Sequence, residues 1–196
     1  STVNETITAR TEAFKEYGFT TQKYQKQIAS LRVEMSELYN VTEKELIGAF
    51  GELEKKFGFT AQSGEKLTDE MVHMTVLMQR AGVNMEQFAG SAKKLQAGFG
   101  KTEIEAMKAT AQVAIFGDAI GIGANGALEQ FNTTMQKLVL YGGTMEQAID
   151  RFRSTSAAAQ FLGVEINKLT DLTASVQNWN NLTEKTQQFN LALLNA

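Results

Sequence analysis

Three glycines near the middle of the chain have the spacing of a nucleotide-binding loop. Gly121, Gly123 and Gly126 spell G-x-G-x-x-G, the fingerprint whose backbone amides approach the pyrophosphate of a dinucleotide. That chemistry needs a strand before the glycines, a helix after them and an acidic residue at the end of a second strand. Gly117 and Asp118 interrupt the apolar run before the motif, and the residues after it have a helical pattern. We therefore interpret the glycines as a break between two closely packed helices and expect no cofactor.

Residues for catalysis or metal binding are otherwise scarce. The chain has no cysteine and a single histidine, His73, which excludes disulfides, thiolate metal sites and metal sites built from several histidines. Acidic residues are scattered along polar faces, so no pair has the apolar setting of a general acid and base. We predict a protein that is not an enzyme, with no catalytic, cofactor-binding or metal-binding residues.

The glycine motif belongs to the longest apolar run of the chain, residues 111–128. Small and large apolar residues alternate around its glycines, which is also typical of membrane-active segments and of helix-packing segments. Asp118 interrupts the run, and no run reaches the ~18 apolar residues of a membrane span. We therefore favour burial against protein, with Phe116, Ile120, Ile122 and Leu128 facing apolar neighbours, and keep membrane contact as the alternative. The residues proposed for a partner or membrane contact are Phe116, Ile120, Ile122 and the only tryptophan, Trp179.

Composition favours a globular chain without a nucleic-acid partner. Apolar residues make up 43% of it, and 19 basic residues against 22 acidic ones give a net charge of −3. Nucleic-acid-binding proteins usually carry a basic face, and no block of basic residues is present here.

The longest predicted loop follows residue 58. We therefore expect a helical extension or subdomain over residues 1–57 and a main helical domain over 58–196.

The spacing of apolar residues predicts an all-α fold. They recur at alternating intervals of three and four, which places each set on one stripe of a helix. The sets include Tyr24, Ile28, Leu31, Met35 and Leu38; Leu46, Phe50, Leu53 and Phe57; Met85, Phe88, Ala92, Leu95 and Phe99; Leu128, Phe131, Met135 and Leu138; and Met145, Ile149 and Phe152. One such stripe, Ile104, Met107, Ala111 and Ile115, precedes the glycine motif and is expected to point into the core. The chain also lacks proline, which helix interiors exclude. We predict a bundle or array of about ten short amphipathic helices, over residues 3–17, 20–38, 42–56, 67–81, 84–98, 102–117, 124–141, 144–162, 166–177 and 183–194.

Repeated turn sequences separate these helices. A glycine ends one helix in the left-handed conformation, an apolar residue folds back, and threonine or asparagine caps the next helix. We expect positive φ at Gly58, Gly142 and Gly163. The spacing also predicts capping boxes, in which the cap and the third helical residue bond reciprocally, at Thr42 and Glu45, Asn84 and Gln87, Thr102 and Glu105, and Thr144 and Gln147.

The C-terminal part of the chain resembles a known family. The segments YGGTMEQAIDRF, FLGVEINKLTDLTASVQNW and NNLTEKTQQFNLALLNA within residues 141–196 are similar to segments of tail tape measure proteins from tailed bacteriophages. Those proteins contain strings of helices opened by such turns, with a late aromatic residue, here Trp179. AGVNMEQFAGSAKKL extends the resemblance to residues 80–196.

The resemblance implies a non-enzymatic structural protein of the virion. Tape measure proteins occupy the tail tube, help to set tail length, assist tube assembly and leave ahead of the genome. This chain has no long uninterrupted heptad rod, so the resemblance implies a compact module and not the ruler itself. It implies tail tube or tail-tip proteins as partners, with self-association as a further option, and a location in the virion tail after assembly in the host cytoplasm. The alternatives are a membrane-active, pore-forming helical domain and a generic helical scaffold or adaptor.

Overall fold

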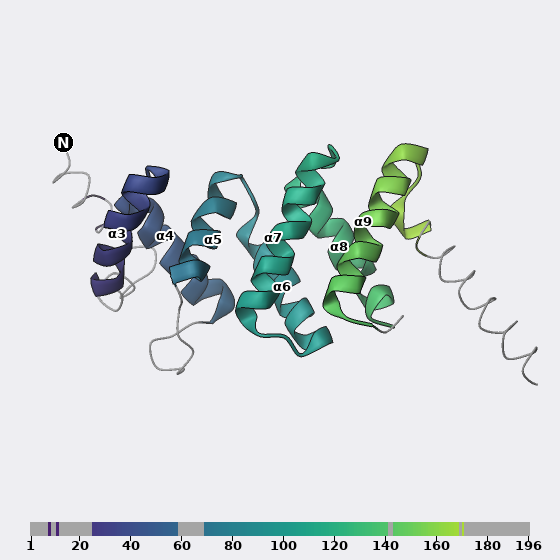
Figure 1. Ribbon diagram of the computed structural model, residues 1–196, viewed down its shortest axis with the longest axis horizontal. Coiled ribbons are helices and arrows are strands. Elements are labelled where there is room, and N and C mark those ends of the chain that lie inside the picture. The colour runs from purple at the N-terminus through teal and green to yellow at the C-terminus, as the bar shows by residue number, and fades with distance from the viewer. Residues whose placement is uncertain are drawn as a thin grey trace, which may run out of the picture.

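The computed structural model confirms the all-α prediction. It describes residues 8, 11, 25–58, 69–140, 143–168 and 170, and within these ranges it contains helices and no strand. The described elements, labelled in Figure 1, are seven α-helices and one π-helix: α3 (Gln25–Tyr39), α4 (Glu43–Glu52), η1 (Leu53–Phe57), α5 (Asp69–Arg80), α6 (Met85–Phe99), α7 (Glu103–Ala119), α8 (Ala124–Leu140) and α9 (Met145–Leu162).

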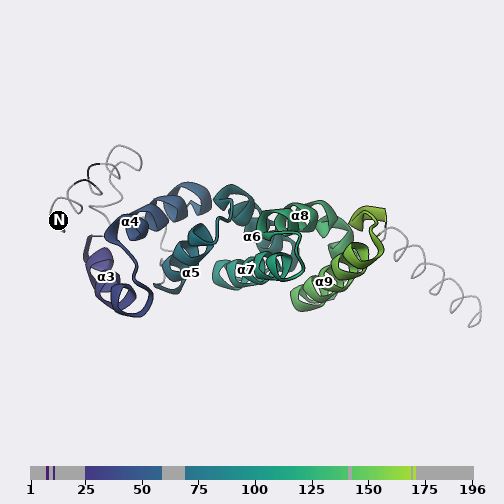
Figure 2. The same cartoon turned by 90° about the horizontal axis from the view of Figure 1, so that it is seen from above.

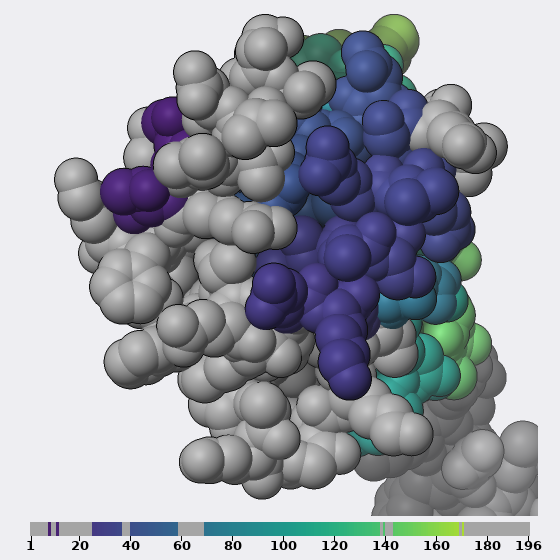
Figure 3. Space-filling view, turned by 90° about the vertical axis from the view of Figure 1, so that its left-hand side faces the viewer, coloured from purple at the N-terminus to yellow at the C-terminus, as the bar shows by residue number. Residues whose placement is uncertain are grey.

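The helices form an elongated array of two rows. Figure 2 shows α3, α5, α7 and α9 along one side and α4, α6 and α8 along the other. Consecutive α-helices run in opposite directions, because short turns make chain neighbours pack as hairpins. The pairs in contact are α3 and α4, α4 and α5, α6 and α7, α7 and α8, and α8 and α9. Helix α7 lies in the middle and contacts α5, α6, α8 and α9. Helix α3 forms the end of the described array that faces the viewer in Figure 3.

One continuous hydrophobic core runs along the array, from Ile28 of α3 to Ile166 beyond α9. Edge-to-face aromatic pairs, an arrangement that the ring quadrupole favours, join helices within it. The rings of Phe57 and Phe88 lie 6.2 Å apart, and those of Phe131 and Phe152 lie 5.1 Å apart. The predicted stripes supply most of the largest fully buried side chains, among them Leu31, Met35, Leu46, Phe50, Leu53, Phe88, Leu95, Met107, Phe131 and Phe152. The division into two parts between residues 57 and 58 stays a prediction. In the described residues, the hydrophobic core includes residues on both sides of this point.

Three of the four predicted capping boxes are confirmed. Thr42, Thr102 and Thr144 each bond reciprocally with the third residue of α4, α7 and α9. Asn84 caps α6 only in one direction, by accepting from the backbone amides of Glu86 and Gln87. The backbone amide of Asn84 donates instead to Asn125 Oδ1 of α8, at 2.7 Å. A contact between helices has replaced the local bond that the motif predicts.

Seven of the predicted helices correspond to described elements, and the predicted 42–56 helix is divided between α4 and η1. The predicted helices at 3–17 and 183–194 and most of 166–177 lie outside the described residues, so the total of about ten stays a prediction. Gly58 and Gly163 follow the last residues of η1 and α9 with φ of +77° and +66°. Gly142 lies outside the described residues.

Candidate interaction surface

The glycine motif forms the turn between α7 and α8. Gly121 and Gly123 have φ of +82° and +75°. The carbonyl of Gly117 accepts from the amides of Ile122 and Gly123, at 3.0 and 3.1 Å, which closes the end of α7. Asp118 Oδ1 accepts from the amide of Ala124 at 2.8 Å and so caps α8. The amide that a phosphate would use at this helix N-terminus is therefore bonded to a carboxylate of the chain itself.

The helix break predicted within residues 111–128 is confirmed. The stretch consists of the end of α7, the turn and the start of α8. Close approach of the two helices depends on Gly117, which the G-x-G-x-x-G spacing does not include. A Cβ atom at Gly117 would overlap the Cβ of Ala127 and lie 2.7 Å from the carbonyl oxygen of Gly123. Glycine at this position lets the two backbones approach where any side chain would clash.

The proposed contact residues are half-buried in this junction. Leu128 is fully buried, and Phe116 and Ile122 pack against the core while keeping part of their surface exposed. Ile120 is half-exposed at the end of α7. Trp179 lies outside the described residues. Whether these residues contact a partner or a membrane stays a prediction.

The prediction for Ile115 is wrong. Met107 and Ala111 of the same predicted stripe are buried, but Ile115 is 59% exposed. The buried surface of α7 is made mainly of small residues, because a helix with four neighbours needs them to let each backbone approach. These buried positions are Ala106, Met107, Ala109, Thr110, Ala111, Val113, Ala114 and Gly117. A pattern weighted towards large apolar residues therefore selects the wrong side of the last turns of α7.

A groove of about 220 Å³ lies between α7 and α9. Its apolar floor is formed by Ala109 of α7 and by Met145 and Ile149 of α9, all of which are buried. Its rim is polar and charged, and is formed by Glu105, Lys108, Gln112, Glu146, Asp150 and Arg153.

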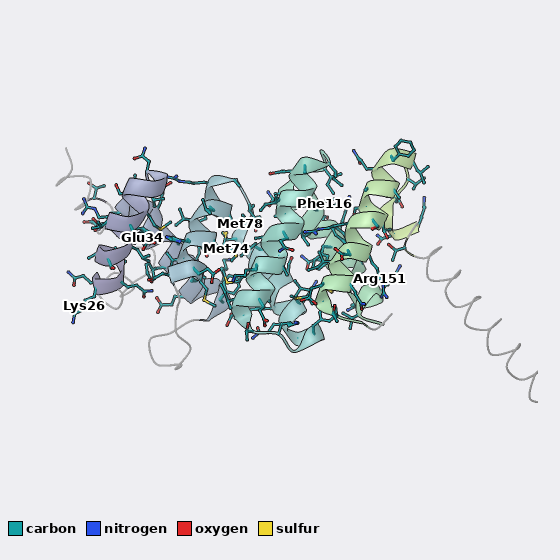
Figure 4. All side chains as sticks on the ribbon, viewed as in Figure 1. Lys26, Glu34, Met74, Met78, Phe116 and Arg151 are labelled. Carbon is teal, nitrogen blue, oxygen red and sulfur yellow. The ribbon has the colours of Figure 1, made fainter. Side chains whose placement is uncertain are left out.

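Arg153 connects the groove to the proposed contact residue Phe116. Its Nη2 donates to Gln112 Oε1 at 3.3 Å, and its Nη1 lies 3.7 Å from Asp150 Oδ1. The guanidinium carbon lies 5.9 Å from the centre of the Phe116 ring, within the range of a cation–π contact. Figure 4 labels Phe116 near the end of α7. Arg153 lines the groove, so Phe116 lies directly beside it.

Carboxylates on the groove rim are held in the ionised form. The hydroxyl and amide of Thr102 donate to Glu105 and lower the pKa of its carboxyl group. The backbone amide of Glu146 and the side chain of Thr144 lower the pKa of Glu146 in the same way. Bonds to the charged form favour it, so Glu105 and Glu146 keep their charge into mildly acidic solution.

Exposed apolar residues continue this surface from α7 to α5. Lys108 Nζ pairs with Glu70 Oε1 at 2.7 Å across the two helices. Leu77 lies seven residues after Glu70 in α5, and Ile115 lies seven residues after Lys108 in α7. Seven residues are about two turns, so each apolar residue lies on the same side of its helix as the paired charge. Leu77 and Ile115 are 43% and 59% exposed. We call the surface formed by Leu77, Ile115, Phe116 and the groove the α5–α7–α9 face.

The sequence pattern missed this face. Leu77 and Ile115 belong to helices with apolar residues on several sides, and nothing in their spacing marks them as exposed. Surfaces of this kind, with apolar residues beside paired charges, are typical of protein contacts. The described residues contain no group of three or more acidic or histidine side chains that could hold a metal ion. None of the described helices is long and apolar enough to cross a membrane.

Comparison of the chain with protein-family models, with curated proteins and with solved structures found no match.

Proposed function

We propose that this chain is a non-enzymatic structural module of a phage virion protein that resembles a tail tape measure protein. The observation that carries the proposal is the turn sequence shared by residues 81–87 and 141–147, which joins the helices of the array. In tape measure proteins, turns of this type open successive helices. The residues of these turns act here as helix caps, with Asn84 opening α6 and Thr144 opening α9.

The proposed role is to bind other proteins through an extended side of the array. The described helices have one continuous core, which makes the array a body that can present contacts along its length. The α5–α7–α9 face offers exposed apolar side chains beside a groove with charged edges. In a tail, the partners would be tube or tail-tip proteins, or a second copy of the module.

We also propose that the array extends to about ten helices joined by glycine-containing turns. Residues 166–177 and 183–194 keep apolar residues at intervals of three and four, as the described helices do. Such an extension would follow the same alternation between two rows.

Detection of the protein in particles tests the virion proposal. Antibodies raised against the purified chain should detect it in purified tailed particles, and the signal should fall after the genome has been ejected. Particles that contain DNA but no detectable antigen would contradict the proposal. Host lysate without phage serves as the control for cross-reaction.

A generic helical scaffold is the second candidate, because the α5–α7–α9 face suits many protein partners. The two candidates differ in where the protein is found. A scaffold would co-purify with cellular proteins and be missing from particles. A membrane-active domain would float with lipid vesicles, and half-burial of Phe116 and Ile122 in the junction favours protein contact over this alternative.

A further inference from the structure

The groove between α7 and α9 has an acidic rim at one end. Helices α7 and α9 run in the same direction, and their first two turns supply Glu105, Glu146 and Asp150 to the rim. Gln112 and Arg153 follow on the same two helices and bond to each other across the groove at 3.3 Å. The carboxylates therefore lie before this bond, at the N-terminal ends of both helices.

Apolar surface lies on both sides of the bond between Gln112 and Arg153. Before it lies the apolar floor of the groove, which includes Ala109. After it lie the half-buried ring of Phe116 and the exposed side chain of Ile115. Ala109 and Phe116 are seven residues apart in α7, which is about 10 Å along the helix. The surface thus offers two apolar patches about two helical turns apart.

The exposed charges of the rim are mainly negative. The side chains of Glu146 and Asp150 are 61% and 74% exposed, and Glu105 is exposed as well. The side chains of Lys108 and Arg153 are 49% and 33% exposed, and both are already paired with carboxylates of the chain. A partner at this end of the groove therefore meets carboxylates, which lysine and arginine side chains complement.

We propose that the groove and Phe116 bind an amphipathic helix of a partner protein that carries lysine or arginine beside its apolar residues. Residues i and i+7 of a helix point to the same side and lie about 10 Å apart, which matches the two apolar patches. One apolar residue of the partner enters the groove, and the other contacts Ile115 and Phe116. Basic residues near the first one pair with Glu105 and Glu146. The inference rests on the proposed role of the α5–α7–α9 face in binding proteins.

Synthetic peptides serve as the probes. The basic peptide is an alanine-based helix of about 18 residues, with leucine at i and i+7 and lysine within one turn of the first leucine. An acidic peptide has glutamate in place of each lysine, and a third peptide has alanine in place of each leucine. Fluorescence anisotropy of each labelled peptide, titrated with the full chain, measures its affinity. We expect the basic peptide to bind on the order of tenfold more tightly than either of the others.

Variants of the chain locate the binding site. Glu105→Gln combined with Glu146→Gln removes two rim charges and keeps a capping side chain at residue 105, and should weaken binding of the basic peptide at least roughly tenfold. Ile115→Ser removes apolar surface after the bond and should weaken it at least roughly threefold. Glu129→Gln removes an exposed charge on α8, in the other row, and should leave the affinity unchanged. Circular dichroism of each variant verifies that the array remains folded.

Several results would overturn the proposal. The first is no binding of the basic peptide, and the second is equal binding of the basic and acidic peptides. The third is an affinity that the double glutamine variant leaves unchanged. A wild-type dimer that Ile115→Ser converts to a monomer would show that a second copy covers this surface instead. Vesicle flotation that Ile115→Ser abolishes would assign the surface to lipid. Absence of the antigen from tailed particles contradicts the virion proposal and leaves the peptide result standing.

Discussion

Substitution of one glycine should separate α7 from α8. In Gly117→Ala, the new methyl group would overlap the Cβ of Ala127 and lie 2.7 Å from the carbonyl oxygen of Gly123. Neither atom can rotate away, so the helices must move apart at a junction in the middle of the core. Overpacking of this kind costs about 1–3 kcal/mol, and alanine recovers about 0.5–1 kcal/mol of helix propensity. We expect a net loss of about 1–2 kcal/mol in the free energy of unfolding.

Gly126→Ala is the matched control. Gly126 lies in α8 near the same turn. A Cβ atom at this position would have no neighbour within 4 Å apart from its own helix and the adjacent residues of the chain, and the backbone φ is not positive. The same substitution should therefore leave stability unchanged or raise it by up to about 1 kcal/mol.

Thermal and urea unfolding, followed by circular dichroism, measure the difference. For a chain of this size, 1 kcal/mol shifts Tm by about 2–4 °C. We expect Gly117→Ala to melt about 2–8 °C below the wild type and Gly126→Ala to melt at or above it. A Gly117→Ala variant as stable as Gly126→Ala would refute the close approach of the two helices.

Three further substitutions test other parts of the array. Gly163→Ala should lower the free energy of unfolding by about 1 kcal/mol, because alanine must adopt the left-handed backbone at φ +66°. The site has space for the methyl group, so backbone strain is the only cost. Equal urea midpoints for the wild type and the variant would refute this. Arg80 bonds to Glu45 at 2.5 and 2.9 Å and lowers the pKa of that carboxyl from 4.5 to about 2. A lowered pKa stabilises the fold above pH 4.5, and this stabilisation is lost as the pH falls towards 2. Because the pair is partly exposed and screened, we expect the free energy of unfolding of the wild type to fall by on the order of 1 kcal/mol more than that of Arg80→Met over this pH range. Parallel plots of unfolding free energy against pH for the two proteins would contradict the linkage. Asn125→Ala removes the acceptor for the Asn84 amide and should cost about 0.5–1.5 kcal/mol in urea unfolding, whereas no change would show that water replaces the bond.

The sequence predicted the local features of this fold well. Apolar residues at intervals of three and four identified buried residues such as Phe50, Phe88 and Phe131. The capping residues Thr42 and Thr144 were predicted as well, because a cap and its partner lie three residues apart and need no information from elsewhere in the chain.

Features that depend on neighbouring helices were not predicted. The role of Gly117 depends on Ala127 across the junction, and the bond from Asn84 to Asn125 joins two helices. The exposure of Ile115 follows from which sides of α7 its four neighbours cover. The groove between α7 and α9 likewise exists only once the rows have formed. Periodicity identifies a buried stripe, but it does not identify the partner that covers each side.

Amide hydrogen exchange along the chain tests the central claim most directly, namely that α7 is the buried centre of a two-row array. Helix α7 contacts four helices, whereas α3 forms an end of the described array. Amides of residues 106–117 should therefore exchange at least roughly tenfold more slowly than those of α3, because local opening there must disrupt the contacts of all four neighbours. Exchange of residues 106–117 as fast as that of α3 would contradict the account.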